Sequence, residues 1–225
     1  MNSARASLIA AVGLVFSAEV VSAQDSFRYR TYVLESSLES VVAASGARAA
    51  DVKTLHERPA RIQELEWRAP YGSAGSEQAD PVRDVSFTFY NDALFQILVS
   101  YDRDRTEGLT NNDVIESLSA TYGVPVPKAA RRRPAAAPPD SVVLAQWENA
   151  ASSLTLVRGE YPAEFQLLLI SKPLTARARS SMQEAIRLDA IEAPRRELDQ
   201  RNKEVADASA ARDKTRTTNK AAFRP

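Results

Sequence analysis

The chain has 225 residues, enough for one large domain or two small fused ones, and its 44% hydrophobic and 26% charged content is ordinary for a folded protein. Basic and acidic side chains number 29 each, so the charge balance indicates no general attraction to nucleic acid or to a membrane surface. With no cysteine and one histidine, His56, the sequence excludes disulfides, thiolate metal sites, a lipidated cysteine and a multi-histidine site within one chain. We therefore predict no cofactor, no metal and no nucleic-acid partner.

Residues 1–23 have the three parts of a secretory signal peptide. Arg5 gives a positive start, residues 6–16 form an apolar core, and Val21-Ser22-Ala23 offers the small residues that signal peptidase recognises. A membrane anchor is the alternative, but the apolar run is shorter than the roughly 20 residues that cross a bilayer. We predict cleavage after Ala23 and export to the periplasm or the outside, with no transmembrane segment in the mature chain.

The first half of the mature chain predicts a strand, a short helix and then extended chain. Residues 27–34 alternate between apolar and polar side chains, which favours a strand. Ser36 and Glu39 match a capping box that begins a helix, and Gly46 is placed to end it. Residues 51–68 are extended in pattern and carry a proline that favours an edge position or a turn.

Residues 85–101 contain the clearest hairpin in the sequence. Phe87 and Phe89 alternate with polar residues, and Asn91-Asp92 supplies a turn that tolerates positive φ. A second alternating strand then returns from Phe95, with its apolar side chains expected on one face.

The segment from Asp102 to Asp113 nearly matches a calcium-binding loop, because oxygen-bearing side chains recur at alternate positions. However, Glu107 stands where the loop requires glycine, and two arginines interleave with the acids. We therefore favour a charged turn before a helix.

The second half begins with a helix and ends with three strands. Thr110 and Asp113 match a helix cap, and Gly123 is placed to end that helix. The strands are predicted at 142–147, 151–158 and 163–171. The last strand is apolar on both sides, so we expect it to be central in the sheet or covered by a helix.

The chain is predicted to end in a helix and a tail. Apolar residues from Leu174 to Ile186 recur at helical spacing, and Pro194 interrupts the pattern. The tail at 194–225 is rich in alanine and charged residues. Apart from a solvated helix reaching about Ala211, we expect it to be largely disordered.

One order of elements occurs twice: a helix, a glycine, a strand ending in tryptophan, and a hairpin. Gly46 and Trp67 hold these places in the first half, and Gly123 and Trp147 in the second. We predict an α+β fold in which two helix-plus-three-strand units form an antiparallel sheet with helices on one face, followed by a C-terminal helix and a disordered tail. The expected boundaries are a signal peptide at 1–23, a first unit with a capping helix at 24–123, a Pro/Arg-rich linker at 124–140, a second strand set with the C-terminal helix at 141–193, and a charged tail at 194–225.

The run Tyr122-Gly123-Val124-Pro125, followed by Trp147 and a hairpin, resembles the outer-membrane assembly lipoprotein (BamE) type, in which a helix ending in Gly-x-Pro leads to strands carrying a tryptophan. A tandem of such units resembles the secreted β-lactamase inhibitor protein type, and by order of elements the match covers 34–171. Both resemblances imply a non-catalytic, protein-binding module in the envelope or outside it. The chain departs from both in lacking cysteines, and it has no Gly-x-Pro turn at Gly46.

Lys128, Arg131, Arg132 and Arg133 form the strongest charge cluster in the sequence. They are our candidate contact for an anion or a phospholipid. The alternative is a solvated linker, which is common for segments of this composition.

The sequence contains no recognised catalytic motif: it lacks a nucleophile elbow, a phosphate-binding glycine loop and HExxH. His56 alternates in phase with the strand positions before it, which favours a half-buried strand histidine over a general base. Trp67 and Trp147 hold matching places in the repeat, which favours core packing over ligand stacking.

We predict an exported protein that binds another envelope or secreted protein without catalysis. A hydrolase that uses carboxylates scattered along the chain is one alternative, and a structural subunit is another. Paired acids with shifted pKa values in a deep pocket would favour the hydrolase, and a concentration-dependent mass would favour the subunit. The sequence leaves the oligomeric state open.

Overall fold

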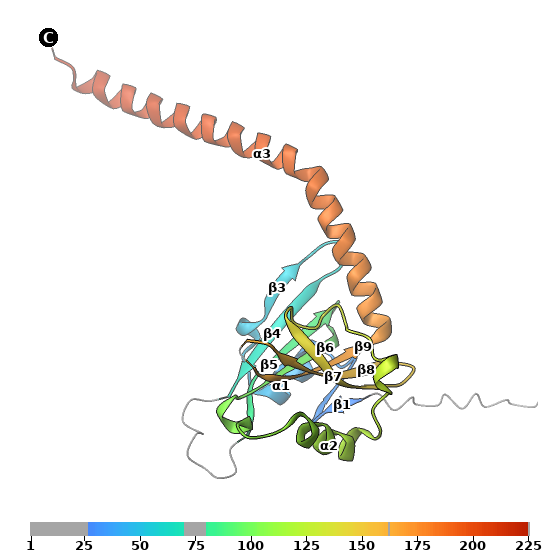
Figure 1. Cartoon of the computed structure of the whole chain (residues 1–225). Helices are drawn as coiled ribbons and strands as arrows, with labels where there is room; N and C mark the ends of the chain where they lie inside the picture. Colours follow the sequence, from blue (N-terminus) through green and yellow to red (C-terminus); the bar gives the residue numbers. More distant parts are fainter. Residues whose placement is uncertain (1–26, 70–79, 162, 225) are drawn as a thin grey trace, which may run out of the picture.

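The computed structural model describes residues 27–69, 80–161 and 163–224, so the predicted signal peptide lies outside the described residues. The described part has a seven-stranded antiparallel sheet, a two-stranded sheet and three α-helices, which confirms the α+β class (Figure 1). The strands are β1 (Arg28–Tyr29), β2 (Tyr32–Val33), β3 (Lys53–His56), β4 (Ile62–Arg68), β5 (Val82–Tyr90), β6 (Ala93–Tyr101), β7 (Ser141–Glu148), β8 (Ser152–Gly159) and β9 (Phe165–Ser171). The helices are α1 (Leu38–Ser45), α2 (Asn111–Tyr122) and α3 (Lys172–Ala222), with short 3-10 helices η1 (Ala49–Asp51), η3 (Asp104–Thr106) and η4 (Lys128–Ala130).

The large sheet consists of two antiparallel meanders that meet at its middle. Its strand order is β3-β4-β5-β6-β9-β8-β7, so β4 to β6 and β7 to β9 are each three consecutive strands. The meanders join where β6 pairs antiparallel with β9, with Leu98 opposite Leu168. Strand β9 is therefore central and buried on both sides, as its sequence predicts. Each meander follows a helix, α1 or α2, and β3 adds an edge strand to the first one. This order is compatible with the predicted duplication, which stays a prediction.

The β5–β6 hairpin forms where it is predicted. Asn91 and Asp92 make its turn with φ values of 46° and 66°, the left-handed conformation that a two-residue hairpin loop requires. The register shifts near Phe89, and this bulge changes which face the following residues occupy. Leu94 and Phe89 therefore face the main core, while Phe95 packs on the other side of the sheet. The prediction that Phe95 shares a face with Ile97 is wrong for that reason.

The main hydrophobic core lies on the face of the sheet that α1, α2 and the β1–β2 hairpin cover. Leu65, Phe87 and Phe89 of the first meander are fully buried there, and Val41 packs onto them from α1. Burying each such side chain stabilises the fold by roughly 1.5–3 kcal/mol relative to leaving it in water.

Gly123 and Trp147 form one packed unit at the end of α2. Gly123 follows α2 with a φ of 82°, and its carbonyl oxygen accepts a hydrogen bond from the indole N–H of Trp147 at 2.7 Å. The Trp147 ring is 1% exposed and lies 6.3 Å, centroid to centroid, from the ring of Tyr122. Core packing of Trp147 is confirmed, and its N–H has the partner that a buried indole needs.

Helix α3 covers part of the opposite face, whereas α1 and α2 both pack on the main core, on the one face predicted for the helices of the two units. Ile62 and Leu65 of β4 point to opposite sides of the sheet. Leu65 belongs to the main core, whereas Ile62 packs with Ala178 of α3. The reason is topological: β9 is central, so the chain that leaves it at Ser171 must cross one face of the sheet.

Residues 124–140, the predicted linker, lie against the sheet. Ala136 and Ala137 pack on Val157 and Leu168, on the face opposite the main core. Alanine side chains are small enough to let this backbone approach the strands closely, and the prolines restrict it to extended conformations and turns. The composition of the segment does not indicate these contacts.

Helix α3 is 51 residues long and continues to Ala222, which corrects the prediction of a largely disordered tail. Figure 1 shows that it is bent and that its second part extends away from the sheet. Pro194 lies inside it and removes one helical hydrogen bond, which bends a helix without having to end it. The guanidinium of Arg196 donates to the carboxylate of Asp189 at 2.8 Å across this region. The tail is helical because alanine, arginine, lysine and glutamate are strong helix formers.

None of the described helices combines the length and the apolar character that a membrane span requires.

Candidate binding site

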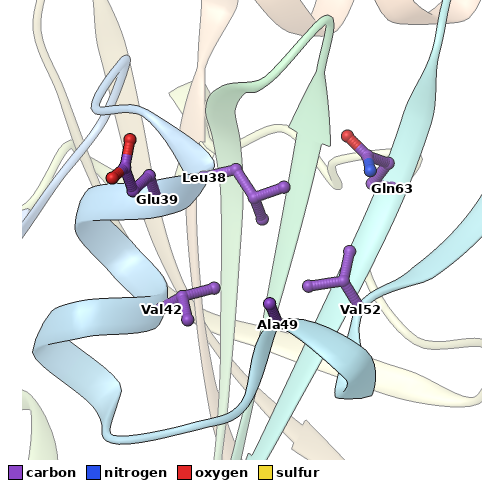
Figure 2. A pocket seen from close by; sticks show the side chains of 6 residues that line it. All are labelled: Leu38, Glu39, Val42, Ala49, Val52 and Gln63. Carbon is purple, nitrogen blue, oxygen red and sulfur yellow. The ribbon is translucent and has the colours of Figure 1, made fainter.

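A pocket of about 330 Å³ lies between α1 and the first strands of the large sheet. It is lined by Leu38, Glu39 and Val42 of α1, Ala49 of η1, Val52, and Gln63 of β4. Figure 2 shows the four apolar side chains converging on one space, with the Gln63 amide at one end of it and the Glu39 carboxylate at the rim. The volume is at the lower end of the range for ligand sites, so it suits one ring system or one large side chain.

The ends of α1 are fixed by short-range contacts. Ser37 is the N-cap, one residue later than predicted, and its hydroxyl oxygen accepts a hydrogen bond from the backbone N–H of Ser40 at 3.2 Å. Gly46 ends the helix with a φ of 68°, as predicted, because a left-handed residue reverses the chain at the least steric cost. The reversal brings the next residues back toward α1.

The wall opposite α1 is held by an ion pair in η1. The carboxylate of Asp51 accepts hydrogen bonds from the backbone N–H of Arg48 at 3.1 Å and from its guanidinium at 2.8 Å. These bonds close the 3-10 turn, so Ala49 and Val52 stand across the pocket from α1.

Gln63 is the one strongly buried polar side chain among the pocket residues. The residue is 8% exposed, and its Oε1 is buried without a hydrogen-bond donor from any described residue. A buried carbonyl oxygen without a donor costs about 1–3 kcal/mol. The Gln63 oxygen is inaccessible to solvent, so it is a cost to the folded state and is not exposed in the pocket.

The sequence carries a signal for this position that our prediction missed. Gln63 alternates in phase with Leu65 and Trp67, both of which pack against the main core. A polar residue at a core-facing position of a strand is unusual, because its hydrogen bonds must be made inside.

The carboxyl groups whose pKa is shifted, among the described residues, are poor candidates for acid catalysis. Hydrogen bonds lower the pKa of Asp51 (from Arg48), Asp80 (from Arg30), Asp113 (from Thr110) and Glu184 (from Arg187). A general acid at neutral pH needs a raised pKa instead. These four groups also belong to separate elements, and no cluster of three or more metal-ligating side chains occurs among the described residues.

The four basic side chains of the predicted anion contact do not act as one group in the structure. The guanidinium of Arg131 donates to the carbonyl oxygen of Leu144, and that of Arg133 donates to the carbonyl oxygens of Ser141 and Pro138. Lys128 and Arg132 are exposed, and the backbone N–H of Arg132 donates to the side chain of Gln146 at 2.8 Å. Two of the four cations are thus engaged with the backbone, and anion binding stays a prediction.

His56 and the loop that begins at Asp102, the candidate general base and the candidate calcium loop, both have structural roles. His56 is half-buried at the end of edge strand β3. The carboxylate of Asp102 accepts hydrogen bonds from the backbone N–H groups of Asp104 and Arg105, at 2.9 and 3.1 Å, and so caps η3. This contact is what the charged-turn interpretation requires.

Comparisons with protein-family models, curated proteins and solved structures gave no match to this chain.

Proposed function

We propose that this chain is an exported, non-catalytic protein that binds another protein through the pocket between α1 and β4. The observation that carries the proposal is the apolar pocket itself, whose lining includes one polar side chain that is largely buried, Gln63. A concave, mostly apolar surface is the usual composition of a binding site.

The parts of the proposal rest on different supports. Export rests on the signal-peptide pattern of residues 1–23. The resemblance to BamE-type and β-lactamase-inhibitor-type modules is part of the proposal, and the order of helices and meanders supports it. A binding role is favoured over hydrolysis because the carboxyl pKa shifts among the described residues are all downward.

The test is to select random peptides displayed on phage for binding to the full chain, and then to measure their affinities for two variants. Ala49→Phe places a ring in the pocket from an exposed position, so the fold should be kept while the pocket is filled. Ala50→Phe is the matched control, because Ala50 is the exposed neighbour that does not line the pocket.

We expect Ala49→Phe to abolish binding of the selected peptides and Ala50→Phe to leave their affinity within about twofold. A selection without binders, or binders that both variants retain, would contradict the proposal.

A further inference from the structure

The part of α3 from Pro194 onward stands in solvent. Each residue from 194 to 224 is exposed, and Figure 1 shows this part extending away from the sheet. Side-chain pairs within it, such as Gln200 with Glu204 at 3.1 Å, are exposed as well and add little to the stability of a helix. Most helices are stabilised by burial of an apolar stripe against a partner, so the stripe that this part carries is informative.

The large apolar residues of this part recur at a single spacing. Between residues 190 and 222 they are Ile191, Leu198 and Val205, each seven residues after the one before, and they are between 55% and 65% exposed. A seven-residue repeat makes a narrow seam along a helix, and a second helix with the same repeat buries such a seam in a left-handed coiled coil.

We infer that α3 pairs with α3 of a second copy of this chain, in a parallel, in-register, two-stranded coiled coil over residues 191–209. A second copy supplies a helix with the identical repeat. This interaction surface is separate from the pocket between α1 and β4 and does not depend on it.

Asn202 selects the parallel arrangement. It follows Leu198 by four residues, so it lies in the same seam. In a parallel pair it faces Asn202 of the second copy, and each side-chain amide can donate to the other and accept from it. An antiparallel pair that sets Ile191 against Val205 would place Asn202 against Pro194, which offers the amide no side-chain partner. A single asparagine in a seam is known to fix the register and to favour two strands.

The charged residues around the seam are compatible with this pairing. Arg187 and Glu192 lie on its two sides, five residues apart, which is the spacing at which opposite charges meet across a parallel coiled coil. Within the chain they already contact Glu184 and Arg58, but both groups are partly exposed and have further hydrogen-bonding positions. Arg195 also falls in the seam, where its aliphatic stem can pack while its guanidinium reaches water.

The first experiment measures the mass of the full chain by sedimentation equilibrium over about a hundredfold range of concentration. The natural chain is compared with Leu198→Glu, in the seam, and with the matched control Gln200→Glu, on the far side of the helix. Glutamate is a strong helix former, and both positions are exposed, so neither change should unfold α3 or the sheet.

We expect the natural chain and Gln200→Glu to shift from one chain to two as the concentration rises, and Leu198→Glu to associate at least about tenfold more weakly. A natural chain that stays monomeric throughout, or equal association of the two variants, would overturn the proposal.

The second experiment tests the parallel register. The chain has no cysteine, so one introduced cysteine reports on its own position alone. Val205→Cys should lie within disulfide reach of residue 205 of the second copy, whereas Asp207→Cys, on the far side of the helix, should not. Under mild oxidation we expect Val205→Cys to form linked dimers at least about tenfold faster. Equal rates, or no linked dimer from Val205→Cys, would contradict the parallel coiled coil.

Discussion

The two outer edges of the large sheet are protected in different ways. Strand β7 is eight residues long, and the following contacts from residues 124–140 occupy its outer side. The backbone N–H of Val126 donates to the carbonyl oxygen of Gln146 at 2.7 Å, and Arg131 and Arg133 donate to the carbonyl oxygens of Leu144 and Ser141. Strand β3 is four residues long, and its register shifts between Thr54 and His56.

The difference follows from edge length. A long, regular edge strand exposes a row of unpaired backbone groups that pair readily with another chain, so it must be covered. A short, bulged strand with a lysine is a poor template for pairing and can stay open. Residues 124–140 therefore cover the β7 side, whereas no described strand pairs with the outer side of β3, and the pocket lies near that edge.

The largest effect is expected where the cover of β7 is removed. Arg131→Ala combined with Arg133→Ala deletes the donors to four backbone carbonyl oxygens, which should lower the free energy of unfolding by about 2–4 kcal/mol. Urea denaturation followed by tryptophan fluorescence measures this loss, and size-exclusion chromatography should show self-association of the exposed edge.

Arg132→Ala is the matched control for that pair, because Arg132 is an exposed neighbour whose bond to Gln146 comes from its backbone. It should change the free energy of unfolding by less than about 0.5 kcal/mol. A loss as large as that of the double variant would show that general charge, and not the capping of β7, stabilises this side.

An intermediate effect is expected at the point where β7 is tied to the start of its covering segment. Trp147→Phe removes the indole N–H that bonds Gly123 and leaves a small cavity, so we expect a loss of about 2 kcal/mol in the free energy of unfolding. Trp67→Phe, in the matching place of the first meander but half-buried, should cost less than about 1 kcal/mol in the same urea titration. Equal losses would mean that the two halves are held in the same way.

The smallest effect is expected at an ion pair that belongs to neither edge. Arg30 contacts Asp80 through two hydrogen bonds of 2.6 Å, which lower the pKa of Asp80, but both side chains are substantially exposed. The stabilisation is therefore present above the ordinary aspartate pKa of about 4 and is lost as the pH falls through the lower folded-state value. Asp80→Asn should lower the free energy of unfolding by less than about 1 kcal/mol at neutral pH, and the difference should shrink below about pH 4. A difference that is constant with pH would exclude the ion pair as its cause.

The features that the sequence predicts well are those that depend on neighbouring residues. Asn91-Asp92 specifies a hairpin turn, Thr110 with Asp113 specifies a helix start, and Gly46 ends α1, because each acts within a few residues of itself. Strand β9 is a further case, since its two apolar faces indicate a central position.

The features that the sequence did not predict depend on contacts between distant segments. The role of Arg133 as a cap requires knowing that the Ser141 carbonyl lies on an edge, which strand order decides. The pocket likewise forms when α1 and η1 fold onto β4, although the core-facing phase of Gln63 was visible in the sequence. Helix α3 beyond Pro194 has few apolar residues to pack against the sheet, so its helical state follows from the helix propensity of its alanine and charged residues.

The most direct test of the binding role is the free energy of unfolding of Gln63→Met. A polar residue in the lining of a binding pocket, with its oxygen buried and unpaired, should be a stability cost to the free protein, in contrast to the arginines that cover β7. We expect Gln63→Met to raise the free energy of unfolding by about 1 kcal/mol in urea, with an unchanged m-value. A fall of similar size would show that the Gln63 amide stabilises the fold itself, and it would contradict the assignment of the pocket as the binding site.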